Sequence, residues 1–192
     1  MSTVQPFRLP DLRDPDVALR LLQRAAELNL RDPLRRGSAI HLPARGQLLM
    51  TGDLHDHLVN LEKILALAQL EQSPHHYLVL HEVIHGPHRL NNMDMSMRML
   101  LRVAALRLHY PGQVFVLLSN HELAQVRGEE ILKEGRSVVR AFNDGLEYQF
   151  GAAADDLCGA LAHYVRSLPL AVCCANGVLA AHSLPSPSQM AQ

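Results

Sequence analysis

The chain has 192 residues, a length that fits one domain with a sizeable hydrophobic core. Hydrophobic residues make up 48% of it and charged residues 19%, and the net charge of -1 leaves no basic excess for a nucleic-acid partner. Three cysteines cannot build a disulfide framework, and no apolar run reaches the ~20 residues of a membrane span. We therefore expect a cytoplasmic protein with no membrane partner. The twelve histidines are a compositional hint of metal chemistry.

The first third of the chain predicts one helix and two strands. The pattern Asp14-Pro15-Asp16 is typical of a helix start, because a carboxylate caps the N-terminus and proline fits the first turn. Apolar residues at helical spacing continue this helix as far as Asp32-Pro33. Two short apolar runs, at 39–42 and 47–50, then predict strands, and the Pro- and Gly-containing turn between them predicts a hairpin.

The middle of the chain alternates apolar runs with amphipathic helix patterns. The runs at 47–50, 77–80 and 114–118 predict buried strands. Strand–helix–strand–helix–strand at these lengths predicts a parallel βαβαβ core with right-handed crossovers. Residues 129–166 then show a helical pattern that is broken near Gly151.

Polar side chains that can bind metal follow each of these strands. The carboxyl ends of parallel strands meet at one sheet edge, where open α/β folds bind their ligands. A later pair of strands, at 168–174 and 178–182, predicts a hairpin around Asn176-Gly177 that ends in a further histidine. Carboxylate, imidazole and amide donors at one edge suit a two-metal site that binds phosphate oxygens. The residues concerned are Asp53 and His55, Glu82 and His85, Asn120 and His121, and His182.

Each of these groups also has an interpretation without chemistry. Asp53 and His55 fit a turn followed by a surface histidine, and Glu82 and His85 fit a polar turn. His182 fits a strand-end histidine with a hydrogen-bond partner. Asn120 fits a helix N-terminus that surface residues follow. The recurrence of the same arrangement after successive strands favours the metal site.

The order of these motifs resembles that of the calcineurin-like metallophosphoesterases, most closely their serine/threonine phosphoprotein phosphatase branch. Gly52-Asp53-Leu54-His55-Asp56 is similar to the family's GDxHG, and Ser119-Asn120-His121-Glu122 is similar to its GNHE. The segment 81–86 occupies the place of GDxxDRG, and 168–171 resembles the LPLA segment. The resemblance covers roughly Gln47 to Pro185. It implies an α/β fold with a βαβαβ core and flanking helices, and we expect the second sheet to be incomplete, as in a fragment or a shortened relative.

The resemblance also implies two divalent metal ions, of the Mn, Fe or Zn class. Asp53 and His55 would hold the first ion, and Glu82 would bridge both. Asn120 and His182 would hold the second ion. The bridging position is an Asp in the family, so Glu82 is one methylene longer than the motif requires.

Two further histidines and two arginines complete the implied site. His121 would donate a proton to the leaving group or steady the phosphate, and His85 stands where the family has the Asp that orients it. A neutral imidazole stabilises an imidazolium less well than a carboxylate does. Gly86 stands where the family's motif has a phosphate-clamping Arg, so Arg89 or Arg127 would have to substitute.

The implied function is metal-dependent hydrolysis of phosphate monoesters, with a phosphorylated protein or small molecule as substrate. Phosphoserine and phosphothreonine are candidates, and dinucleoside polyphosphate hydrolysis is the alternative within enzymes. The altered second motif, and the absence of the family's last ligand motif after His182, leave a second hypothesis: a non-catalytic module that binds phosphate or a protein partner. An open sheet edge would favour a homo-oligomer. We assign 1–36 to a lead-in and helix, 37–185 to the metallophosphoesterase domain and 186–192 to a disordered tail.

Overall fold

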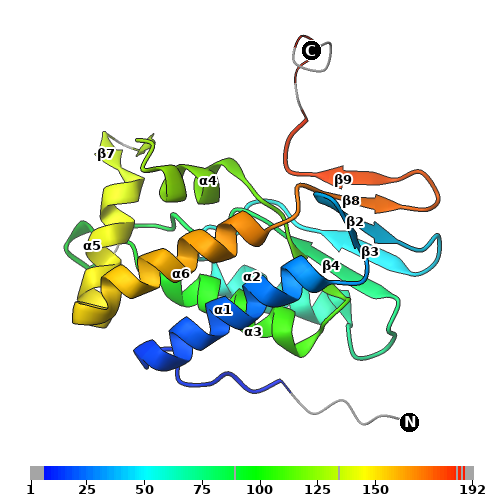
Figure 1. The fold of residues 1–192 in the computed structure, drawn as a ribbon, viewed down its shortest axis with the longest axis horizontal. Coiled ribbons are helices and arrows are strands. Elements are labelled where there is room, and N and C mark those ends of the chain that lie inside the picture. Colours follow the sequence, from blue (N-terminus) through cyan, green and yellow to red (C-terminus); the bar gives the residue numbers. More distant parts are fainter. Residues whose placement is uncertain (1–6, 89, 134, 185, 187, 189–192) are drawn as a thin grey trace.

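The computed structural model describes residues 7–88, 90–133, 135–184, 186 and 188. Its central sheet has three parallel strands in the order β3-β4-β5, so the predicted βαβαβ core is confirmed. Figure 1 shows the strands of the two larger sheets gathered on one side of the molecule and most of the helices on the other. The core elements are β3 (Gln47–Met50), α2 (Leu58–Ala68), β4 (His76–Leu80), α3 (Met97–His109) and β5 (Val114–Val116).

A second sheet of four strands lies against the first. Its order is β1-β2-β8-β9, and β8 and β9 form the predicted antiparallel hairpin. The strands are β1 (Arg35–Arg36), β2 (Ala39–Leu42), β8 (Ala171–Cys174) and β9 (Leu179–Ala181). The predicted tail at 186–192 lies almost entirely outside the described residues.

The predicted hairpin between 39–42 and 47–50 is wrong. β2 pairs in parallel with β8, with Ile40 opposite Val172, whereas β3 pairs in parallel with β4. The intervening turn carries the chain from one sheet to the other. At its end the amide of Gln47 donates to the carbonyl of His75, the residue before β4, at 2.9 Å. Gly46 makes this approach feasible, since a Cβ there would lie 2.0 Å from the same carbonyl oxygen.

The central sheet is buried on both faces, as parallel sheets usually are. Alternate residues of β4 and β5 point to opposite faces, one toward the helices and the other toward the second sheet. Leu78, Leu80, Val114 and Val116 belong to the helix-side core, and Tyr77, Val79, Phe115 and Leu117 belong to the core between the sheets.

The helices outside the core build the remaining layer. α1 (Pro15–Arg31) begins as predicted, because the Asp14 carboxylate accepts from the amides of Asp16 and Val17. It packs beside α6 (Ala154–Ser167), as Figure 1 shows. Short 3₁₀ turns occupy Leu90–Asn92 and Gly151–Ala153, and α4 (Asn120–Arg127) and α5 (Val138–Phe150) complete the helices. No described helix is long and apolar enough to cross a membrane.

The helical prediction for 129–166 is wrong at its start. Two very short strands, β6 (Leu132–Lys133) and β7 (Arg136–Ser137), pair here as an antiparallel hairpin. Gly135 takes a φ of 75° between them, a left-handed backbone that glycine adopts without a steric penalty. The rest of the predicted span is helical, with the expected break near Gly151.

A buried ion pair ties α1 to α3. The guanidinium of Arg107, only 1% exposed, forms an ion pair with the Asp32 carboxylate at the end of α1. Its Nε donates to the Asn29 Oδ1 at 3.1 Å, and its Cζ lies 5.0 Å from the centre of the Phe115 ring. This contact fixes the helix layer against the central sheet.

Candidate metal centre

The loops after β3 and β4 are joined by backbone hydrogen bonds. The amides of Leu54 and His55 both donate to the Glu82 carbonyl, at 3.0 and 2.8 Å. Four residues of these loops that carry polar side chains, His55, Asp56, Glu82 and His85, have left-handed φ angles of 41°, 58°, 47° and 60°. Non-glycine residues rarely adopt this backbone, and such strain gathers at functional sites. The loops therefore hold the polar side chains in one fixed arrangement.

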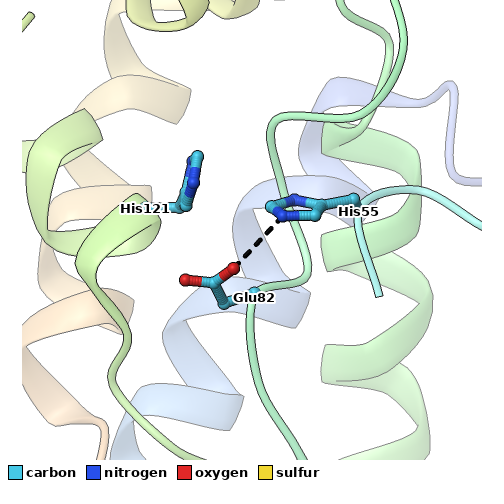
Figure 2. Close-up of side chains that lie close together, drawn as sticks. All are labelled: His55, Glu82 and His121. Carbon is cyan, nitrogen blue, oxygen red and sulfur yellow. Dashed lines mark ion pairs between the residues drawn. The ribbon is translucent and has the colours of Figure 1, made fainter. Parts of the chain in front are cut away.

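His55, Glu82 and His121 form the one group among the described residues whose donor atoms all lie within 4.8 Å of one another and could hold a metal ion. Figure 2 shows His55 and Glu82 side by side, with His121 facing them from α4. The His55 Nε2 lies 3.1 Å from Glu82 Oε2. Its Nδ1 lies 2.7 Å from the Ile84 carbonyl, which can only accept, so Nδ1 carries the proton. The neutral ring thus offers its Nε2 lone pair as a ligand, as metal-binding histidines do.

The other oxygen of Glu82 faces a second polar group. Glu82 Oε1 lies 3.4 Å from His182 Nε2, and the same nitrogen lies 2.8 Å from Asn120 Oδ1. The His182 Nδ1 lies 3.3 Å from the Nδ1 of His81, which in turn lies 3.7 Å from an Asp53 oxygen. Glu82 therefore stands between His55 on one side and the His182–Asn120 pair on the other.

Burial and like charge act together on the Glu82 carboxyl. Burial first, and then the carboxylates of Asp53 and Glu122, raise the pKa of Glu82 to about 7. Burial also lowers the pKa of His121 and of His182, with the neighbouring histidines adding to the effect. Each shift disfavours the charged form of a crowded group. A cation placed among these ligands would reverse that cost for Glu82.

The predicted catalytic pair, His85 and His121, is in direct contact. Their Nδ1 atoms lie 2.8 Å apart, and His85 Nε2 lies 2.9 Å from Gln125 Oε1. The Gln125 amide donates its Nε2 to Asn143 Oδ1 at 2.7 Å, which leaves Oε1 to accept from His85. His85 is fully buried, and burial lowers its pKa to about 4, so the ring is neutral.

This chain of hydrogen bonds sets the tautomer of His121. If His85 donates from Nε2, its Nδ1 has no proton and must accept from the Nδ1–H of His121. The neutral His121 then has its lone pair on Nε2. In this state His121 is a ligand or a proton acceptor at Nε2, and it becomes a donor there only after it takes up a second proton.

Three residues of the site were not predicted as such. Glu122 is fully buried, and its Oε1 accepts from the amide of Val83 at 2.8 Å while its Oε2 accepts from the Ser119 hydroxyl. It thereby fixes the loop that carries Glu82. His81 and Gln125 position His182 and His85 by the contacts given above. Of the three, Glu122 had a signal in the sequence, because it completes the motif that resembles GNHE.

Arg89 and Arg127 are the two arginines predicted to bind substrate. Arg89 lies outside the described residues. Arg127 ends α4, where its exposed guanidinium pairs with the Glu129 carboxylate at 2.8 Å. It is absent from the pocket of about 440 Å³ that opens beside the metal-ligand candidates. That pocket is lined by His55, Gly86, Pro87, His88, Lys133 and Arg136.

Comparison with known proteins identifies the fold. The sequence matches no family model and no curated protein. Among solved structures, the chain is similar to a protein serine/threonine phosphatase from Saccharomyces cerevisiae that has similarity to human phosphatase PP5. The TM-score is 0.63 over 90% of this chain, at 18% sequence identity. The chain has the calcineurin-like metallophosphoesterase fold. It spans about half of that phosphatase, 49% of its length.

Proposed function

We propose that this chain hydrolyses phosphate monoesters with the help of two divalent metal ions of the Mn, Fe or Zn class. The observation that carries the proposal is the position of Glu82, whose two oxygens face His55 and His182 separately. A bridging carboxylate between two ligand groups is the arrangement that a dinuclear site requires. The fold of a serine/threonine phosphatase supports the same reaction class.

The proposed ligands divide into two groups around Glu82. Asp53 and His55 would hold the first ion, and Asn120 and His182 would hold the second. When bound, such ions would supply positive charge to the phosphoryl oxygens and lower the pKa of the attacking water. The donor set fits such ions, because carboxylate, imidazole and amide oxygen are all represented, and because burial and then the neighbouring carboxylates raise the pKa of Glu82.

His121 and His85 act on the substrate side of this centre. His121 faces the ligands from α4 and meets the phosphoryl group or the leaving oxygen. His85 orients it through the Nδ1–Nδ1 hydrogen bond. Because the Nε2 of the neutral His121 has no proton, protonation of the leaving group requires the imidazolium form, which the neutral His85 stabilises poorly.

Turnover of an aryl phosphate tests the proposal. Protein dialysed against a chelator and then given Mn²⁺ should hydrolyse a chromogenic aryl phosphate, and Asn120→Ala should lose most of this activity. Asn60→Ala is the matched control, because Asn60 is an exposed residue of α2. Equal rates for Asn120→Ala and the unsubstituted protein would reject the proposal.

Metal content gives an independent readout. Elemental analysis of Mn²⁺-loaded protein should find two ions per chain, and fewer in Glu82→Gln. His182→Ala should retain one ion, because His55 and Glu82 remain as ligands of the first site. Two ions in all three proteins would mean that Glu82 is not the bridge.

The second candidate is a non-catalytic module that binds phosphate or a protein partner. The replacement of the family's Asp by His85 favours it, since this change weakens the acid at the leaving group. This candidate predicts no metal-dependent turnover of any ester. If turnover is found, comparison of phosphopeptides with dinucleoside polyphosphates at equal metal concentration separates protein phosphatase activity from nucleotide hydrolysis.

A further inference from the structure

The pocket beside His55 is lined by two cationic side chains from a segment that no family motif covers. Its volume is about 440 Å³, and Lys133 and Arg136 of the β6–β7 hairpin form part of its lining. The same lining includes His55, a member of the metal-ligand group. The two cations therefore share one cavity with the candidate metal centre.

Lys133 and Arg136 are directly opposite each other in the hairpin. The register pairs Lys133 with Arg136 and Leu132 with Ser137. Side chains at paired positions lie on the same face of a ribbon, and like charges placed there destabilise the pairing. An anion held between the two side chains would remove this repulsion. The hairpin thus has a built-in preference for a negatively charged ligand.

Among the described residues, neither side chain has a carboxylate partner. Lys133 and Arg136 form no ion pair within that part of the chain. Arg136 donates from Nη1 to Asn92 Oδ1, a neutral acceptor that fixes one nitrogen of the guanidinium and leaves its charge uncompensated.

The position from which the family motif supplies a guanidinium is closed in this chain. Gly86 occupies it, and a Cβ at Gly86 would lie 2.4 Å from the Asp56 Cβ and 3.2 Å from the His55 carbonyl oxygen. No larger side chain fits there while Asp56 keeps its place. Gly86 and Pro87 line the same pocket as the two hairpin cations.

We propose that Lys133 and Arg136 of the β6–β7 hairpin bind the phosphate group of the ester substrate, and the inorganic phosphate product, in the pocket beside His55. The planar guanidinium of Arg136 suits two phosphoryl oxygens, and the Lys133 ammonium adds a point charge. The assignment to substrate rests on the proposed phosphoesterase function. The assignment to phosphate as a ligand does not, because binding is measurable without turnover.

Calorimetric titration of the full chain with inorganic phosphate, with and without Mn²⁺, tests the binding step. Lys133→Met and Arg136→Gln should each weaken phosphate binding about tenfold, the effect of losing one charge-assisted hydrogen bond. Arg140→Gln is the control, because Arg140 is exposed on the neighbouring helix α5, is absent from the pocket lining and makes the same change in net charge. Its affinity should stay within twofold. The substituted side chains are exposed, so thermal unfolding should confirm that the fold is retained.

Kinetics separates this inference from the proposed function. On an aryl phosphate, the two pocket variants should raise KM about tenfold with kcat nearly unchanged, and Lys133→Arg should restore the KM. Normal turnover with an unchanged KM and phosphate affinity in both variants would overturn the pocket assignment and leave the phosphoesterase proposal intact. Absence of all turnover, with phosphate binding that depends on Lys133 and Arg136, would reject the enzyme and support the pocket. No phosphate binding by the unsubstituted protein would overturn the assignment.

Discussion

The Nδ1 atoms of His85 and His121 lie 2.8 Å apart, so one ring donates a proton to the other in a single hydrogen bond. His85 is fully buried and its other nitrogen faces Gln125 Oε1, which makes His85 the acceptor in this pair. A carboxylate at the same place would accept the same proton and add a negative charge. The side chain at position 85 therefore controls how readily His121 becomes a cation.

Replacing His85 by Asp should increase activity on esters with poor leaving groups. The carboxylate favours the charged form of His121, so its pKa rises and its Nε2 carries a proton at higher pH. General acid catalysis contributes roughly 10²- to 10⁴-fold, so the rate on a phosphoserine peptide should rise at least about tenfold relative to an aryl phosphate. Residue 85 has a φ of 60°, a backbone that Asp adopts more readily than most residues. The measurement is the ratio of the two kcat/KM values.

His85→Asn is the matched control for this prediction. Asn has nearly the shape of Asp and can accept the same hydrogen bond, but it has no charge. The ratio of phosphoserine to aryl phosphate activity should remain low in His85→Asn. A similar gain in both variants would show that the negative charge is not responsible.

The stability of the metal-free protein should depend on pH through Glu82. The pKa of this carboxyl is raised to about 7 in the folded state from its ordinary 4.5, so the folded chain binds the proton more tightly than the unfolded chain. Its contribution to stability is complete below about pH 4.5 and is lost as pH rises through 7. Glu82→Gln should therefore unfold at a higher temperature than the unsubstituted protein at pH 8, and the difference should close toward pH 5.

Thermal unfolding in the presence of a chelator checks this dependence. A difference between the two proteins that stays constant from pH 5 to pH 8 would contradict it. Saturating Mn²⁺ should reverse the order at pH 8, because an ion that binds the folded state stabilises it more the more tightly it binds, and Glu82→Gln weakens that binding.

Removing the Asp32 carboxylate should destabilise the helix layer strongly. Arg107 would keep its charge inside the core, only 1% exposed and without its carboxylate partner. Breaking a buried ion pair in this way costs about 3–5 kcal/mol of unfolding free energy. Urea unfolding of Asp32→Ala should show a loss of this size. The double variant Asp32→Ala with Arg107→Met should recover much of it, whereas equal losses in both would mean that the charge is not the cause.

The core of the fold was predictable because its pattern is local. Each strand of the βαβαβ unit is a short apolar run followed directly by an amphipathic helix, and this order fixes a parallel sheet. The pairing of 39–42 was not predictable, because its partner is β8, about 130 residues further along the chain. Apolar alternation identifies a buried strand without naming its neighbour. The β6–β7 hairpin was missed because two-residue strands are too short to show any alternation.

In the site too, the residues set by local patterns were predictable and the contacts between distant elements were not. Glu82, Asn120 and His182 come together after the ends of strands from both sheets, and strand ends can be read from the sequence. The contacts of His85 with Gln125, and of Gln125 with Asn143, depend on how α4 and α5 pack, which no short motif records. The tautomer of His121 therefore became evident only from the fold.

The close approach of residues 56 and 86 determines which of these two positions can be substituted first without a steric clash. Asp56 has a φ of 58°, and its Cβ would lie 2.4 Å from a Cβ at position 86. An arginine introduced first at position 86 would meet Asp56, and the loop would have to shift. A glycine introduced first at position 56 relieves the left-handed backbone and clears the space. The two substitutions toward the motif of the phosphatases can occur in either order, and the order that begins at residue 56 avoids this clash.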